Sequence, residues 1–104
     1  MSNAISNVSE KDFATFTAQG KVIIDFWAAW CGPCRMQGQI LDQAASDFAA
    51  NDIKVGKVNV DEEGELARKF GVSSIPTLVL FKDGKAIKTL VGMQQADALI
   101  KHFA

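Results

Sequence analysis

Both cysteines of this 104-residue chain lie in one short motif, Trp30-Cys31-Gly32-Pro33-Cys34. The motif follows an apolar run that predicts a buried strand, and it stands at the beginning of an amphipathic pattern that predicts a helix. Residues three apart in a first helical turn share one face, so the two sulfur atoms can reach bonding distance with little backbone movement. Pro33 fixes φ where a helix begins, and Gly32 leaves the approach to the sulfurs open. This spacing predicts a pair poised for thiol–disulfide exchange.

The helix start also predicts an acidic thiol at Cys31. Unpaired N–H groups and the positive end of the helix dipole stabilise a thiolate there. A helix end contributes about 0.3–2 kcal/mol to a nearby anion, so we expect the pKa of Cys31 to fall by about one pH unit from about 8.5. At neutral pH this raises the thiolate fraction from roughly 3% to roughly a quarter, and the thiolate is the nucleophile.

Two other uses of the cysteines compete with exchange. A structural disulfide that closes a four-residue loop removes only roughly 2 kcal/mol of unfolded-state entropy, and a domain of this size needs no such staple. A metal site needs four ligands, whereas the chain supplies two cysteines and one histidine, His102. We therefore expect no metal in a single chain, while a dimer that shares two cysteine pairs around one metal stays open as an alternative.

The elements that must position the cysteines can be read from hydrophobic spacing. Helices separate the first strands, which implies parallel pairing, whereas Asp83-Gly84 marks a hairpin that joins antiparallel strands. The product is one mixed sheet with helices on both faces. The patterns predict strands at 22–28, 53–60, 77–81 and 86–91, and helices at 10–19, 34–50, 61–70 and 94–103.

Composition excludes several classes of function. With 48% hydrophobic and 22% charged residues, the chain has the balance of one soluble domain over 1–104. Eleven Lys plus Arg against twelve Asp plus Glu leave a net charge of −1, which argues against binding to nucleic acid or anionic membranes. We see no secretory signal and no membrane-spanning run, so we expect a cytoplasmic protein. Ser2-Asn3-Ala4 resembles the remnant of an expression tag, and no inference rests on it.

The chain resembles the thioredoxin family over essentially its whole length. The resemblance implies a thioredoxin fold, with a single mixed five-stranded sheet flanked by four helices. It adds one short strand near residues 4–7 that hydrophobic spacing does not reveal. The resemblance rests on motifs in family order: Asp25-Phe26-Trp27-Ala28, Trp30-Cys31-Gly32-Pro33-Cys34-Arg35-Met36, Lys57, Asn59, Asp61, Ile75-Pro76-Thr77 and Val91-Gly92.

The reaction that the resemblance implies is general reduction of protein disulfides. Cys31 would attack the substrate, and Cys34 would then attack Cys31 to release it. Asp25 interrupts an apolar strand, where burial should raise the pKa of its carboxyl. The family has a buried Asp behind the second cysteine that assists its proton transfer, with Lys57 as the neighbour, and the resemblance gives Asp25 that role.

The remaining site residues also come from the resemblance. Pro76 would be in cis and face the disulfide, so that the backbone of Ile75 could pair with an extended substrate. An apolar contact surface for partner proteins would surround the sulfurs, formed by Trp30, Gly32, Pro33, Ile75, Val91 and Gly92.

The family's partners follow in the same way. The resemblance implies a redox-active Cys31–Cys34 disulfide without a bound cofactor, re-reduced by thioredoxin reductase, a flavoprotein that uses NADPH. The substrates would be disulfide-containing reductases and peroxidases of the cytosol, and we expect a monomer. A non-catalytic binding module with this fold is a second alternative. An oxidant or isomerase is a third, which Gly32-Pro33 and the lack of a signal disfavour.

Overall fold

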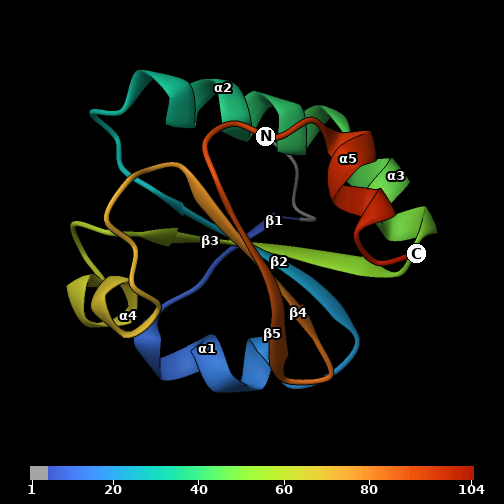
Figure 1. Cartoon of the computed structure of the whole chain (residues 1–104), viewed down its shortest axis with the longest axis horizontal. Coiled ribbons are helices and arrows are strands. Elements are labelled where there is room, and N and C mark those ends of the chain that lie inside the picture. Colours follow the sequence, from blue (N-terminus) through green and yellow to red (C-terminus); the bar gives the residue numbers. More distant parts are fainter. Residues whose placement is uncertain (1–4) are drawn as a thin grey trace.

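The computed structural model describes residues 5–104, which fold around one mixed sheet. The strand order is β1-β3-β2-β4-β5, in which β1, β3 and β2 are parallel and β4 and β5 run antiparallel to their neighbours (Figure 1). This arrangement confirms the mixed five-stranded sheet, including the short first strand. The strands are β1 (Ile5–Asn7), β2 (Lys21–Trp27), β3 (Ile53–Asn59), β4 (Thr77–Lys82) and β5 (Lys85–Val91).

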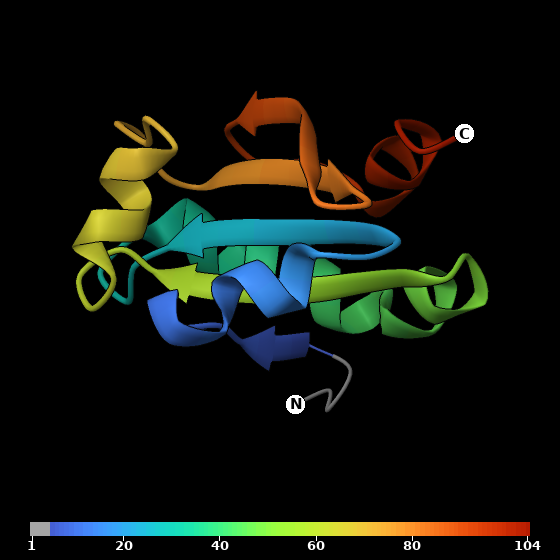
Figure 2. The same cartoon turned by 90° about the horizontal axis from the view of Figure 1, so that it is seen from below.

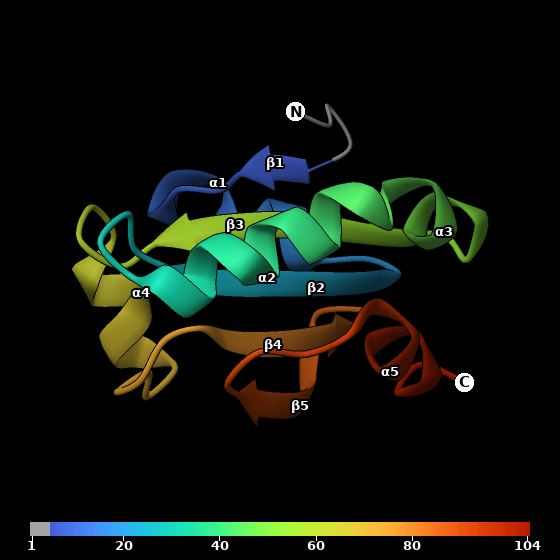
Figure 3. The ribbon, with the colours of Figure 1, turned by 90° about the horizontal axis from the view of Figure 1, so that it is seen from above.

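Helices cover both faces of the sheet. Seen from below, α1 lies in front of the strands and α4 lies beside the carboxyl ends of β2 and β3 (Figure 2), and seen from above, α2 crosses over β2 (Figure 3). Within residues 5–104 there are five helices: α1 (Glu10–Thr17), α2 (Gly32–Gln43), α3 (Ala45–Ala50), α4 (Gly64–Lys69) and α5 (Ala96–Lys101).

Side-chain alternation along β2 divides the core in two. Residues two apart in a strand point to the same face of the sheet. Val22, Ile24 and Phe26 pack toward α1 and α4, in what we term the aromatic core: Val8, Phe13, Val22, Ile24, Phe26, Val58, Leu66, Ala67, Val79 and Phe81. Ile23 packs on the other side in the α2-side core: Ile23, Leu41, Ala44, Phe48, Ile53, Val55, Leu78, Leu80 and Leu99.

The helix predicted over 34–50 is two helices, so the prediction of four flanking helices was wrong. The break falls at Ala44, whose φ of −98° and ψ of 10° leave the helical region. Hydrogen bonding continues through it, because Ala44 N–H donates to Ile40 O at 3.1 Å and Phe48 N–H donates to Ala44 O at 3.0 Å. Leu41, Ala44 and Phe48 all pack in the α2-side core, so the buried face continues across the break.

Other helices begin or end a few residues away from their predicted boundaries. The helix predicted over 61–70 begins at Gly64, because the N–H groups of Glu62 and Glu63 bond to Asn59 O in a turn. The helix predicted over 10–19 ends at Thr17, before Gly20 takes a φ of +73°. Ala4, expected in the first strand, and Ser2-Asn3 lie outside the described residues. Among the helices of residues 5–104, none combines the length and apolarity that crossing a membrane requires.

Candidate active site

The two cysteines lie where β2 passes into α2. Cys31 is the N-cap residue of α2, and its Sγ accepts a hydrogen bond from Cys34 N–H at 3.2 Å. The two residues form a disulfide with their Cα atoms 5.2 Å apart. Both side chains are almost fully buried, whereas Gly32 and Pro33 between them are exposed. The sulfur that faces the helix start is Cys31, as the sequence predicts, and a negative charge on it would meet N–H groups.

A second segment, Ile75-Pro76, lies beside Cys31 although it is distant in the sequence. The carbonyl oxygen of Ile75 lies 3.8 Å from the Cys31 Sγ, and the Ile75–Pro76 peptide bond is cis. The N–H of Gly92 donates to Pro76 O at 2.8 Å, so the end of β5 lies beside the same segment. Ile75, Pro76, Val91 and Gly92 therefore come together next to the cysteines.

Trp30 extends the same surface. Its side chain is 69% exposed, yet its indole Nε1 donates a hydrogen bond to Asp61 Oδ2 at 2.9 Å, which restrains the ring. Asp61 is restrained in turn, because its N–H donates to Asn59 Oδ1 at 2.9 Å. Sequence reasoning missed this role of Asp61, and the only signal for it was its place among the family motifs.

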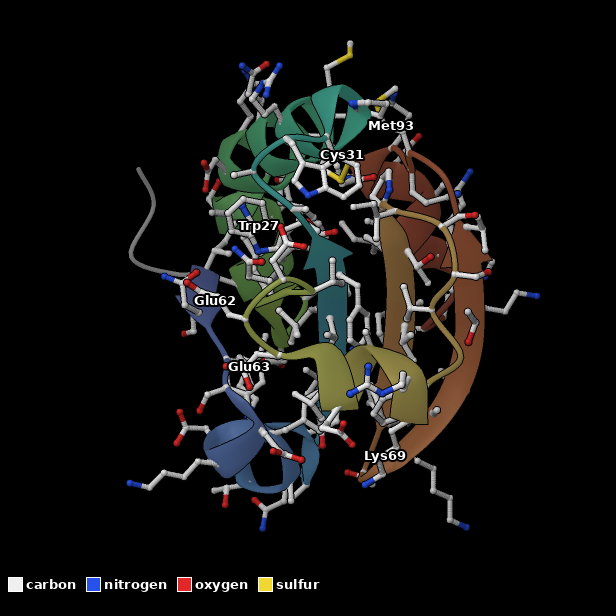
Figure 4. The ribbon with its side chains drawn as sticks, turned by 90° about the vertical axis from the view of Figure 1, so that its left-hand side faces the viewer. Trp27, Cys31, Glu62, Glu63, Lys69 and Met93 are labelled. Carbon is white, nitrogen blue, oxygen red and sulfur yellow. A yellow bond between two sulfur atoms is a disulfide. The ribbon has the colours of Figure 1, made fainter. Side chains whose placement is uncertain are left out.

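Most of the large exposed apolar side chains lie at this end of the molecule, and the exception within the described residues is Ile87 in β5. Trp30, Met36, Val91 and Met93 are all at least 40% exposed, and Figure 4 shows Met93 at the same end as Cys31. Exposed apolar side chains that cluster in this way are typical of a protein-binding surface. The arrangement presents a disulfide inside an apolar rim.

Asp25 is buried in the middle of β2 with no exposed surface. Neither of its carboxyl oxygens has a hydrogen-bond partner within residues 5–104. Burial raises the pKa of Asp25 from 3.8 to about 7, and the positive charge of Lys57 on the facing position of β3 opposes that rise. An unpartnered carboxyl is costly in a core, so this one calls for a functional explanation.

The carboxyl of Asp25 faces the underside of α2. Ile23 and Leu41 pack in the α2-side core, and Asp25 is two residues further along β2, on the same face. Because the chain passes from the end of β2 at Trp27 to the start of α2 at Gly32 and then back over the sheet, Asp25 lies beneath the turns of α2 that follow Cys34. Lys57 reaches the same space, since a Cβ on Gly38 of α2 would lie 3.3 Å from its Nζ.

Lys57 also borders a cavity that opens beside the site. Its Nζ lies 4.3 Å from the centre of the Trp27 ring, a cation–π contact. Trp27 and Lys57 line a cavity of about 310 Å³ together with Asn59, Glu62, Glu63 and residues 7–9, and Figure 4 shows Trp27, Glu62 and Glu63 along one side of the molecule. The charged end of Lys57 is therefore reachable from solvent, whereas Asp25 is not.

The histidine does not join the cysteines. His102 follows α5 as an exposed C-cap residue, and α5 lies beside the far end of α2 from the start of that helix (Figure 1). No group of three or more His, Cys, Asp or Glu side chains within residues 5–104 is arranged to hold a metal ion. One chain therefore brings only two sulfur ligands to this site.

Comparison with known proteins identifies a family. A sequence model of the thioredoxin family matches residues 4–104. A thioredoxin of Chlamydia caviae is 46% identical over 94 residues, 90% of each chain. A thioredoxin of Mycobacterium tuberculosis is 42% identical over 104 residues, which cover 98% of this chain and 89% of the relative.

Solved structures agree. The crystal structure of a thioredoxin from Malassezia sympodialis matches with a TM-score of 0.85 and 35% identity, covering 96% of this chain and 94% of that one. A chain from a structural study of thiol resolution in yeast mitochondrial 1-Cys peroxiredoxin matches with a TM-score of 0.83 and 32% identity, covering 94% and 92%. The chain thus belongs to the thioredoxin family, the protein-disulfide reductases that exchange electrons with thioredoxin reductase and disulfide-bearing substrates, and Cys31–Cys34 is its redox-active disulfide.

Proposed function

We propose that this chain is a cytoplasmic dithiol reductant in which Cys31 is the attacking thiolate and Cys34 the resolving thiol. The observation that carries this assignment is the position of the Cys31 Sγ, which accepts the N–H of Cys34 at the start of α2 and lies 3.8 Å from Ile75 O. Cys34 lies one turn further into the helix and is 1% exposed. A substrate therefore meets Cys31 first.

The reaction proceeds by two successive thiol–disulfide exchanges. The Cys31 thiolate attacks one sulfur of a substrate disulfide, which forms a mixed disulfide and expels the other substrate sulfur as a thiolate. Cys34 then loses its proton and attacks the Cys31 Sγ, so that the Cys31–Cys34 disulfide forms and the second substrate thiolate leaves. Two electrons pass to the substrate, whose thiolates take up two protons. Thioredoxin reductase, using NADPH, returns two electrons to the pair.

Asp25 is the proposed acceptor for the proton of Cys34. Its position beneath the first turns of α2 and its pKa of about 7 support this role, because at neutral pH such a carboxyl can both take up and release a proton. Lys57, which faces Asp25 across the strand pair, supports the ionised form. We expect the Asp25→Asn substitution to slow release of the mixed disulfide, measured by rapid-mixing kinetics over a range of pH.

The contact surface is the proposed docking site for substrate. Trp30, Gly32, Pro33, Val91 and Gly92 would contact the polypeptide around the substrate disulfide. An extended segment could pair with the backbone of Ile75, because the following Pro76 has no N–H to compete. The exposure of Trp30 and Val91, at 69% and 64%, supports this use.

The setting of the reaction is also part of the proposal. We infer that residues 1–104 act as one monomeric domain in the cytoplasm, and that its substrates include reductases and peroxidases there. The likeness to a chain studied with a 1-Cys peroxiredoxin and the glutathione and thioredoxin systems supports a peroxidase among those substrates.

The reduction potential of the Cys31–Cys34 pair tests the direction of electron flow. Equilibration with a defined dithiol buffer, followed by the fluorescence of Trp27 and Trp30, would give the potential. A value more negative than that of the cytosolic glutathione pool supports a reductant. A clearly less reducing value would identify an oxidant or isomerase instead.

Substrate trapping tests the roles of the two cysteines. The Cys34→Ser variant should accumulate a covalent mixed disulfide with substrate, whereas Cys31→Ser should trap nothing. Trapping by both variants or by neither contradicts the assignment. Cellular activity of a double serine variant would favour a non-catalytic binding module, and a metal-bound dimer in purified protein would favour the metal-bridging alternative.

A further inference from the structure

Gln37 is a fully buried amide in α2, one turn after Cys34. Burying an amide without hydrogen bonds costs free energy, so the amides found in protein cores are almost always hydrogen-bonded. The family motifs in the sequence do not include this position, and none of the steps proposed above uses it. Its signal in the sequence is spacing, because Cys34, Gln37 and Leu41 share one face of the helix.

Both ends of the Gln37 amide bind a single residue on the other side of the site. Its Nε2 donates to the backbone carbonyl of Gln94 at 2.9 Å, and its Oε1 accepts the backbone N–H of Gln94 at 2.7 Å. One side chain thus bonds both backbone polar groups of a residue 57 positions away in the sequence. Two bonds to one residue restrain its orientation as well as its distance from the helix.

The restrained residue adjoins the contact surface. The side chain of Gln94 donates from Nε2 to Gly92 O at 3.3 Å, and the N–H of Gly92 donates to Pro76 O at 2.8 Å. Gly92 has a φ of +90°, a conformation that glycine adopts without strain. The chain of hydrogen bonds therefore runs from α2 through Gln37, Gln94 and Gly92 to Pro76, beside Ile75 and Cys31.

We propose that Gln37 is a positioning residue that holds the segment from Val91 to Met93 against α2 and thereby sets the affinity for protein disulfides. The inference rests on the proposed function, in which that segment contacts substrate. The hydrogen bonds of the Gln37 amide go to Gln94, and none joins Gln37 to either sulfur within residues 5–104. We call the two hydrogen bonds between Gln37 and Gln94 the clamp. Loss of the clamp should therefore weaken protein binding and leave the reactivity of the sulfurs unchanged.

The Gln37→Met substitution tests the clamp, because Met has a similar length and shape but forms neither hydrogen bond. The matched control is Gln39→Met, the same change at an exposed position of the same helix. Reduction of insulin and of hydroxyethyl disulfide would be measured with dithiothreitol as electron donor. We expect the KM for insulin to rise about 5-fold in Gln37→Met, with kcat and the rate with hydroxyethyl disulfide unchanged. Gln39→Met should match the parent.

Two results would overturn the inference. One is an unchanged KM for insulin in folded Gln37→Met, and the other is an equal loss of rate with both disulfides, which a general structural defect would cause. If Gln37→Met does not fold, Gln37→Glu replaces it. A protonated Glu can donate to Gln94 O as the amide does, so the KM relative to the parent should fall as the pH is lowered. A ratio that does not change with pH contradicts the clamp.

The same assay separates this inference from the proposed function. A parent protein that reduces neither disulfide would contradict the function itself. A parent that reduces both, beside a Gln37→Met variant with parental KM, would contradict only the role of Gln37.

Discussion

The two sides of the central sheet bury different kinds of residue. On the α1 side, Phe13, Phe70 and Phe81 pack ring against ring, with centroids 5.1–5.7 Å apart. On the α2 side, the buried residues include the carboxyl of Asp25 and the amide of Gln37. Both polar atoms of the amide have a hydrogen-bond partner, whereas neither carboxyl oxygen has one within residues 5–104.

This difference separates stability from chemistry. Close aromatic packing stabilises the fold without offering a reactive group. An unpartnered carboxyl destabilises the fold, and it lies beneath the helix that begins at the cysteines. Asp25 is an exception to the rule that buried polar groups have hydrogen-bond partners, and it lies on the side of the sheet that carries the reaction. Such exceptions are expected at functional sites.

Removing an aromatic ring from the α1 side should have the largest effect on stability and none on the chemistry. Phe13→Ala leaves a cavity between Phe70 and Phe81, so we expect the free energy of unfolding to fall by about 3–5 kcal/mol, measured by urea denaturation. The reduction potential should not change, because α1 lies on the far side of the sheet. Phe13→Leu, which retains most of the volume, should cost about 1 kcal/mol. A shifted potential in Phe13→Ala would show that the two sides are not separate.

Asp25 should make stability depend on pH. Its pKa is 3.8 when unfolded and about 7 when folded, so the folded state binds more protons between these values and stability falls as the pH rises through them. The difference between the two pKa values corresponds to a decrease in the free energy of unfolding on the order of 4 kcal/mol, which is complete above about pH 7. The Asp25→Asn variant should lack this slope in urea denaturation of the oxidised protein at a series of pH values. Parallel curves for the parent and the variant would contradict the assignment.

A smaller effect should follow from releasing Trp30. Asp61→Ala removes the acceptor of the indole N–H, so the exposed ring should become mobile. We expect the KM for a protein disulfide to rise about 3-fold and the fluorescence anisotropy of Trp30 to fall, measured in a Trp27→Phe background. Asp61→Asn retains an acceptor oxygen and serves as the control. If Asp61→Ala has parental KM and anisotropy, the hydrogen bond does not position the ring.

One substitution in the helix above Asp25 should raise stability. Gly38→Ala should stabilise α2 by about 1 kcal/mol through helix propensity. The new Cβ would lie 3.3 Å from Lys57 Nζ, the free end of a flexible side chain that can move aside. Chemical denaturation of the parent and of Gly38→Ala would measure the gain. A loss of stability would mean that Lys57 is held firmly between α2 and the Trp27 ring.

Local patterns in the sequence predicted the features that depend on neighbouring residues. The spacing of Cys31 and Cys34, the buried strand before them and the Asp83-Gly84 hairpin all follow from short-range backbone and side-chain preferences, and the structure contains each of them. The family motifs added the first strand and the cis bond before Pro76. The same patterns predicted one helix over 34–50, because amphipathic spacing does not record a bend at Ala44.

Only the tertiary structure decided which distant residues meet. The sequence by itself determined that a cysteine pair begins a helix after a buried strand, since those residues are adjacent in the chain. The resemblance implied that Pro76 faces the disulfide and that Lys57 lies beside Asp25, whereas only the structure showed the bonds of Gln37 to Gln94 and of Trp30 to Asp61. All of these contacts depend on strand register and on the packing of helices and loops against the sheet. Register and packing come from the fit of whole faces to one another, and no short window of sequence contains that information.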